Sequence, residues 1–83
     1  MYAFGFKAKG QLGRVFLATT GEIALHELLC ELDEHVVYGT LCAEDSEWAS
    51  QSLKNQEDST FRSVTVRDGD CAEITYWMQK VGA

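Results

Sequence analysis

The first residues of the chain alternate apolar with small or charged side chains. The apolar positions are Tyr2, Phe4, Phe6 and Ala8. A period of two is the pattern of a β-strand with one buried face. Residues 10–13 begin and end with glycine and lead into residues 14–18, which are again rich in strand formers. This spacing predicts a β-hairpin.

The next segment changes to the period of a helix. Thr19, followed three residues later by Glu22, forms a capping-box pattern that predicts a helix start. Four leucines then make one apolar stripe, namely Leu25, Leu28, Leu29 and Leu32. We expect one amphipathic helix that packs through these leucines. Its solvent side is acidic and carries Glu27, Glu31 and Glu34.

The middle of the chain has weaker patterns. Residues 35–43 are rich in β-formers, and they predict a third strand. Residues 44–59 are polar and have Trp48 and Leu53 as their only large apolar side chains. Because they lack a clear helical period, we expect a flexible loop there or a short helix near residues 46–54.

The C-terminal segment predicts a second hairpin. Residues 60–67 and 71–81 flank Asp68-Gly69-Asp70, a typical turn sequence. A loop of odd length pairs even-numbered positions with each other, and a three-residue loop of residues 67–69 would supply it. One buried face would then consist of Val64, Val66, Ala72, Ile74, Tyr76 and Met78.

These elements predict a single α+β domain over residues 1–83. Their order is ββαβββ, with a largely antiparallel sheet and one amphipathic helix packed on one face. The second face of the sheet would meet solvent or a partner.

The charge of the chain is uneven. It holds 13 acidic and 7 basic residues, for a net charge of −6. No acid precedes Glu22, whereas the acids are dense from Glu22 to Asp58, where Lys54 is the one base. Such a field repels phosphate backbones and attracts basic proteins. Nucleic-acid binding is therefore disfavoured, and a protein partner with a basic surface is expected, although charge that serves solubility alone is the simpler alternative.

The sequence also bears on location and cofactors. It has no apolar run near the ~18 residues of a membrane span and no signal-peptide core. Cys30, Cys42 and Cys71 are an odd number at unpatterned spacing, which argues against a disulfide framework. We expect a cytoplasmic protein with no membrane association and no cofactor. Gly10 to Gly13 is too short to be a phosphate-binding loop.

Three groups of residues are candidates for contact with a partner. Phe61 and Trp77 lie on the second face of the final hairpin, where other parts of the chain could also cover them. Ile23 and Cys30, seven residues apart, form a thin apolar line opposite the leucine stripe that could be a dimer seam. Trp48 is a third candidate. His26 is four residues from Cys30, but this pair alone is weak evidence for zinc or catalysis.

Two main hypotheses for function follow. The first is a small, acidic, non-enzymatic interaction module of the inhibitor, immunity or regulatory type, which uses the acidic helix with Glu27, Glu31 and Glu34, residues 44–59, or the face with Phe61 and Trp77. The alternative is a homodimer that binds a small ligand or acts as a catalyst in a pocket between its subunits. That pocket would be lined by Trp48, Tyr38, His26 or Trp77. An assembly subunit that pairs through a strand edge is a third possibility.

Overall fold

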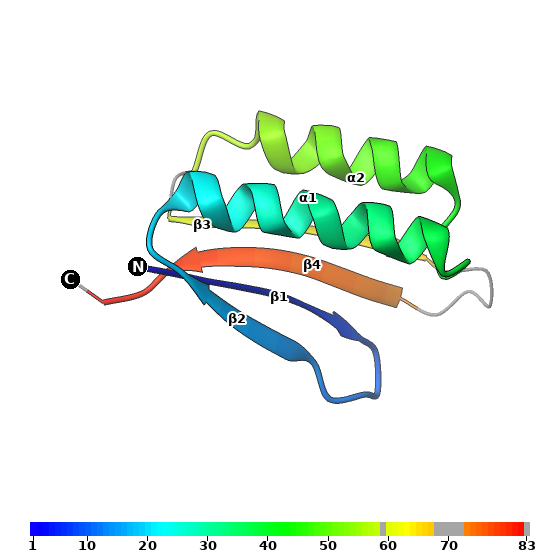
Figure 1. The fold of residues 1–83 in the computed structure, drawn as a ribbon, viewed down its shortest axis with the longest axis horizontal. Helices are drawn as coiled ribbons and strands as arrows, with labels where there is room; N and C mark the ends of the chain where they lie inside the picture. The colour runs from blue at the N-terminus through cyan, green and yellow to red at the C-terminus, as the bar shows by residue number, and fades with distance from the viewer. Residues whose placement is uncertain (59, 68–72, 83) are drawn as a thin grey trace.

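The computed structural model describes residues 1–58, 60–67 and 73–82. Its elements are β1 (Tyr2–Ala8), β2 (Arg14–Ala18), α1 (Gly21–Val37), α2 (Ala43–Asn55), β3 (Phe61–Arg67) and β4 (Glu73–Lys80). The strands form one antiparallel sheet in the order β2-β1-β4-β3. Both helices cover the same face of this sheet, and the other face has no helix (Figure 1). The small α+β class is therefore confirmed.

The N-terminal hairpin forms as the alternation predicts. Phe4 pairs with Phe16 across β1 and β2, and their rings stack with centroids 5.4 Å apart. On the other side of β1, Phe4 pairs with Met78 of β4. The apolar side of β1 therefore faces the helices and joins the core.

The first helix begins and ends later than the sequence pattern suggests. Thr20, not Thr19, is its N-cap, because the Thr20 hydroxyl accepts a hydrogen bond from the Ile23 amide at 3.2 Å. The helix ends in a Schellman motif, in which the Thr40 amide donates to the His35 carbonyl and the Gly39 amide donates to the Val36 carbonyl. Gly39 adopts a left-handed φ of 80°.

The predicted strand at residues 35–43 is wrong. Its first part is the last turn of α1, and the remainder is the tight connection to α2. Val36 lies four residues after the buried Leu32 and packs against the core. The apolar stripe of α1 therefore continues through a stretch that is rich in β-formers.

Of the two alternatives for residues 44–59, the structure has the helix, which is longer than the expected 46–54 and spans Ala43–Asn55. Cys42 caps α2, since its Sγ accepts a hydrogen bond from the Asp45 amide at 3.4 Å. The buried side chains of α2 are Ser46, Ala49 and Leu53. The order is therefore ββααββ, and the predicted order ββαβββ with a single helix is wrong.

The C-terminal hairpin has the predicted parity but a different register. Val64 pairs with Tyr76 and Val66 pairs with Ile74, so even positions do face even positions. These four side chains and Met78 are buried as predicted. Arg67 pairs with Glu73, which rules out the three-residue loop at 67–69. The Asp68-Gly69-Asp70 turn and Ala72 lie outside the described residues.

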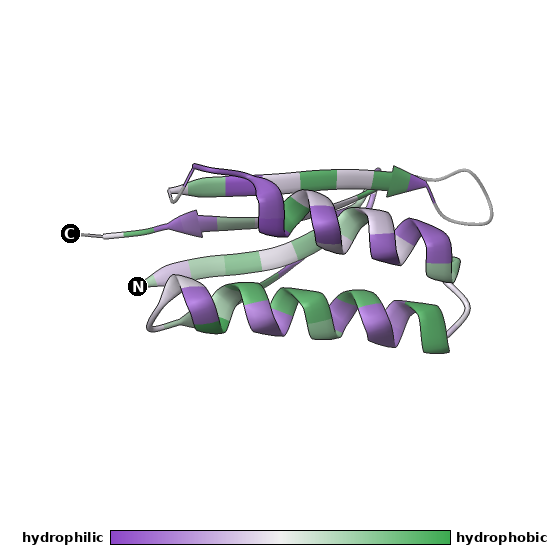
Figure 2. Ribbon diagram, turned by 90° about the horizontal axis from the view of Figure 1, so that it is seen from above, coloured by the Kyte–Doolittle hydropathy of each residue, from purple (hydrophilic) through white to green (hydrophobic). Residues whose placement is uncertain are grey.

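The core lies between the helical layer and the sheet. The largest fully buried side chains are Tyr76, Leu28, Leu32 and Leu53, and each buried leucine contributes about 2 kcal/mol through removal of apolar surface from water. In Figure 2 the two helices lie side by side over the sheet, and bands of hydrophobic and hydrophilic residues alternate along each helix.

The side chain of Gln56 closes the outer edge of β3. Its Nε2 donates to the Ser63 carbonyl at 2.8 Å, and its Oε1 accepts from the Ser63 amide at 3.1 Å. The side-chain amide of Gln56 thus forms the two hydrogen bonds that a residue of a neighbouring strand would form. These bonds connect the end of α2 to the sheet. Arg62 adds a second tie, because its Nη1 donates to the Leu53 carbonyl at 3.1 Å.

Candidate functional site

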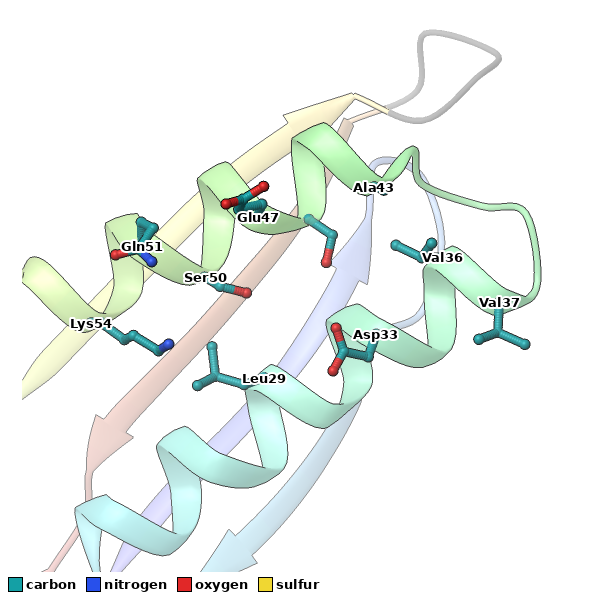
Figure 3. Close-up of a pocket in the computed structure, with 10 residues that line it drawn as sticks. Leu29, Asp33, Val36, Val37, Ala43, Glu47, Ser50, Gln51 and Lys54 are labelled. Carbon is teal, nitrogen blue, oxygen red and sulfur yellow. The ribbon is translucent and has the colours of Figure 1, made fainter.

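The two helices enclose a groove that opens to solvent on the outer side of the helical layer. We call it the interhelical groove. Its volume is about 590 Å³. The lining residues come from both helices and are Leu29, Asp33, Val36, Val37, Ala43, Ser46, Glu47, Ser50, Gln51 and Lys54 (Figure 3).

The groove follows from the sizes of the side chains on its two walls. Half of the residues of the α2 wall have short side chains, namely Ala43, Ser46 and Ser50. The α1 wall supplies the branched side chains of Leu29 and Val36, which are half-buried at the edge of the core. Since short side chains on one helix leave space beside long ones on the other, an apolar floor stays open to the surface.

The charges at the groove are mainly negative. Asp33 stands on α1 and Glu47 on α2, so a carboxylate is present on each wall, while Lys54 lies at the end of the groove away from Val37 (Figure 3). Within the described residues, neither Asp33 nor Glu47 has an ion-pair partner. An apolar floor with carboxylates on both walls can receive apolar side chains and cations together.

The acids predicted as contact residues do not line this groove. Glu27, Glu31 and Glu34 are three or four residues apart and share another side of α1, although Glu34 is next to Asp33 in the sequence. Glu27 and Glu34 are exposed. Glu31 is half-buried, and its Oε2 lies 3.9 Å from Nε2 of His35.

The aromatic pair predicted on the second face of the sheet is present there. Trp77 pairs with Ser63 and Phe61 pairs with Gln79, so the two aromatic residues are diagonal neighbours. Phe61 is 46% exposed, and Trp77 is half-buried. They lie on the side of the sheet opposite the interhelical groove.

The remaining predicted contact residues are exposed on the helical layer. Ile23 and Cys30 lie along one line of α1, as predicted, and Val37 extends that line by another seven residues. Trp48 is exposed on α2. The Cys30 sulfur is 3.7 Å from His26 Nε2. The predicted contact residues thus lie on separate surfaces of the molecule.

Sequence reasoning missed a polar cluster beneath α1. Nδ1 of His35 hydrogen-bonds to the hydroxyl of the fully buried Tyr76, and the Phe6 ring meets the imidazole edge to face at 4.7 Å. Burial lowers the pKa of His35 below its ordinary value, although the nearby Glu31 and Glu34 oppose this effect. Burial also raises the pKa of Tyr76. The hydrogen bond between the two side chains joins α1 to β4.

Within residues 1–58, 60–67 and 73–82, no group of three or more His, Cys, Asp or Glu side chains could hold a metal ion. Cys30 and Cys42 are free and exposed. No helix in these ranges is both long and apolar enough to cross a membrane.

Comparison with known proteins adds no functional assignment. No protein-family model, curated protein or solved structure matches the chain. The function must therefore be argued from the geometry of the molecule itself.

Proposed function

We propose that this protein is a small, non-enzymatic binding module whose interhelical groove receives a basic amphipathic segment of a partner protein. The observation that carries the proposal is the pairing of Asp33 and Glu47, on opposite walls, with the apolar floor made by Leu29 and Val36. A basic amphipathic helix matches both features, because its apolar side chains enter the floor and its Lys or Arg side chains reach the carboxylates.

The dimensions of the groove limit the length of that segment. Along α1 the lining runs from Leu29 to Val37, which corresponds to about 12 Å at ~1.5 Å per residue. This length accommodates about two helical turns, with apolar anchors spaced three or four residues apart. An interface this short predicts an affinity in the micromolar range and a marked dependence on salt.

The charge of the whole helical layer supports the same class of partner. The segment from Glu22 to Asp58 holds ten acidic residues and one basic residue, Lys54. The resulting field attracts a basic segment from a distance, while the groove supplies its contacts. This division of roles predicts that acids outside the groove affect the association rate more than the dissociation rate.

The residues suggested for a ligand pocket between subunits lie on two opposite surfaces. Trp48 and Tyr38 are exposed on the helical layer or at its end, whereas Trp77 lies on the far side of the sheet. One two-fold interface can therefore use the residues of the helical layer or Trp77, but not both sets, so either version of that pocket has fewer of these side chains.

A designed peptide tests the proposal. The probe is an amphipathic peptide of about 12 residues made of Leu and Lys, and its binding is measured by calorimetry at about 50 and about 500 mM NaCl. The combined variant Asp33→Asn and Glu47→Gln removes the two groove carboxylates. Glu27→Gln with Glu34→Gln is the matched control, since it removes the same charge from the other flank of α1.

The proposal expects a loss of affinity of about tenfold or more for the groove variant and less than about threefold for the control. A second peptide, with Ser in place of Leu, is expected not to bind. Equal losses in the two variants, or equal binding of the two peptides, would mean that only general charge attraction operates, and the groove would be rejected.

A further inference from the structure

The sheet has a second face that no helix covers (Figure 1). We call it the open face. The strand registers place two adjacent rows of side chains across all four strands of this face. One row contains Val15, Gly5, Trp77 and Ser63, and the other contains Leu17, Ala3, Gln79 and Phe61.

The two rows are apolar and differ in exposure from strand to strand. On the edge strand β2, Val15 and Leu17 are 63% and 65% exposed. On the neighbouring strand β1, Ala3 is 7% exposed and Gly5 is buried. The β2 backbone approaches β1 closely there, since a Cβ at Gly5 would lie 2.0 Å from the Arg14 carbonyl oxygen. The side chains that a second copy can reach are therefore those of Val15, Leu17, Trp77 and Phe61.

The open face differs from the helical layer in charge. Its two apolar rows contain no ionisable side chain. The charged residues of this face, Lys7, Glu73 and Arg67, lie beyond these rows toward the other end of the sheet. Two copies that each carry a net charge of −6 repel through their acidic helices, so the open face is where they approach at least cost.

From these observations we infer that the open face binds the open face of a second copy of this chain. A two-fold axis parallel to the strands, midway between β1 and β4, lays each β1 over the partner's β4 and each β2 over the partner's β3. The rows are kept in register by this operation. The indole of Trp77 then lies over the partner's Gly5 and Ala3, and Leu17 lies over the partner's Phe61.

This arrangement satisfies what an isologous interface requires. Each large side chain meets a small one or another apolar one, and the same contacts occur twice. Face-to-face sheets also pack in this way in β-sandwiches, at about −30° between strand directions. Both acidic helical layers point outward, so the two interhelical grooves stay accessible, and the dimer does not depend on what they bind.

The area of the open face limits the affinity that we expect for the dimer. Four strands at about 4.8 Å spacing, with seven residues at about 3.3 Å each, present a face of roughly 400 Å². Such a face belongs to the class of small, transient interfaces. We therefore expect a reversible dimer with a dissociation constant of about 10 to 100 µM.

Sedimentation over a concentration series tests the dimer. From about 5 to about 500 µM, the mass is expected to rise from 9.3 kDa to twice that value and to stop there. Leu17→Lys and Phe61→Lys are each expected to leave a monomer throughout this range. Val37→Lys is the matched control, because Val37 is 81% exposed on the helical layer, and this variant is expected to dimerise like the original chain.

Each other outcome overturns the inference. A mass of 9.3 kDa at the highest concentration excludes the dimer. Loss of association in Leu17→Lys but not in Phe61→Lys indicates pairing through the β2 edge instead, and mass that grows beyond two copies indicates open-ended assembly. Loss in Val37→Lys alone places the contact on the helices.

A spectroscopic readout does not depend on the folding of these variants. Trp48→Phe leaves Trp77 as the one tryptophan, and its emission is expected to shift to the blue across the same concentration range as the mass changes, because the partner covers the indole. Emission that stays constant while the mass doubles would show that the contact lies elsewhere.

Discussion

Nδ1 of His35, in the last turn of α1, forms a hydrogen bond with the hydroxyl of Tyr76, in the middle of β4, 41 residues away in the chain. This bond joins the helical layer to a central strand of the sheet. The Phe6 ring of β1 packs against the imidazole, and Glu31 lies near its other nitrogen. Burial lowers the pKa of His35, and this shift couples the stability of the fold to pH.

We expect the fold to lose stability in mild acid through His35. Its pKa in the folded protein lies below the ordinary value of 6.5 because burial disfavours the charged ring. As pH falls through 6.5, the unfolded chain takes up a proton before the folded one does, so the free energy of unfolding decreases until the folded pKa is passed. Above pH 6.5 the contribution is fully present.

Urea unfolding between about pH 8 and about pH 4.5 measures this dependence. The comparison is with His35→Gln, in which the His35 part of the slope is expected to vanish, and with His26→Gln, which is expected to keep it because His26 is exposed. Equal slopes in all three proteins would contradict the assignment and would leave the carboxylates as the source.

Tyr76→Phe is expected to lower the free energy of unfolding by about 1 to 2 kcal/mol. The change removes the hydroxyl but keeps the ring, so the packing against Phe6 is retained while Nδ1 of His35 loses its partner. Tyr38→Phe is the control, because Tyr38 is 76% exposed. An unaltered urea midpoint for Tyr76→Phe would show that the bond adds nothing to stability.

Gln56→Ala is expected to cost about 1 to 2 kcal/mol, because it removes two hydrogen bonds to the backbone of Ser63. It also uncovers the edge of β3, so faster hydrogen exchange is expected at the Ser63 amide. Gln51→Ala, at an exposed position of α2, is expected to change stability by less than about 0.5 kcal/mol. A loss of the same size in both variants would contradict a specific contribution of the Gln56 hydrogen bonds.

Gly39→Ala is expected to destabilise the protein by about 1 to 2 kcal/mol, because Gly39 has a φ of 80° that a side chain makes unfavourable. A Cβ at this position would meet no atom within 4 Å, so the cost is conformational rather than steric. Gly39→Asn is expected to cost less, since Asn tolerates this conformation better. Thermal unfolding of the two variants measures the difference. A larger loss of stability in Gly39→Asn than in Gly39→Ala would contradict the conformational explanation.

The same glycine explains one failure of sequence analysis. Residues 35–43 contain Val36, Val37 and Tyr38, whose preference for strands led to the wrong prediction. Packing of Val36 beside Leu32 outweighs that preference. The signal for a helix was available, because a glycine directly after an apolar stripe is typical of a helix C-terminus.

The second helix was harder to foresee. Its buried positions are Ser46, Ala49 and Leu53, which have helical spacing but little hydrophobicity. A period based on large apolar residues therefore indicates this helix only weakly, as one of two alternatives. Ser46 also lines the interhelical groove, together with Ala43 and Ser50, so the candidate site could not be predicted without α2. The two hairpins were predictable, because alternation along β1 and β4 reflects one buried face.

The central claim is that the interhelical groove binds a basic amphipathic segment, and amide chemical shifts measure it most directly. Titration with the Leu and Lys peptide is expected to shift the amides of Leu29, Asp33, Val36, Glu47 and Ser50, and to leave those of Phe61 and Trp77 unchanged. Shifts that gather instead around Glu27 and Glu34, or on the open face, would contradict the claim.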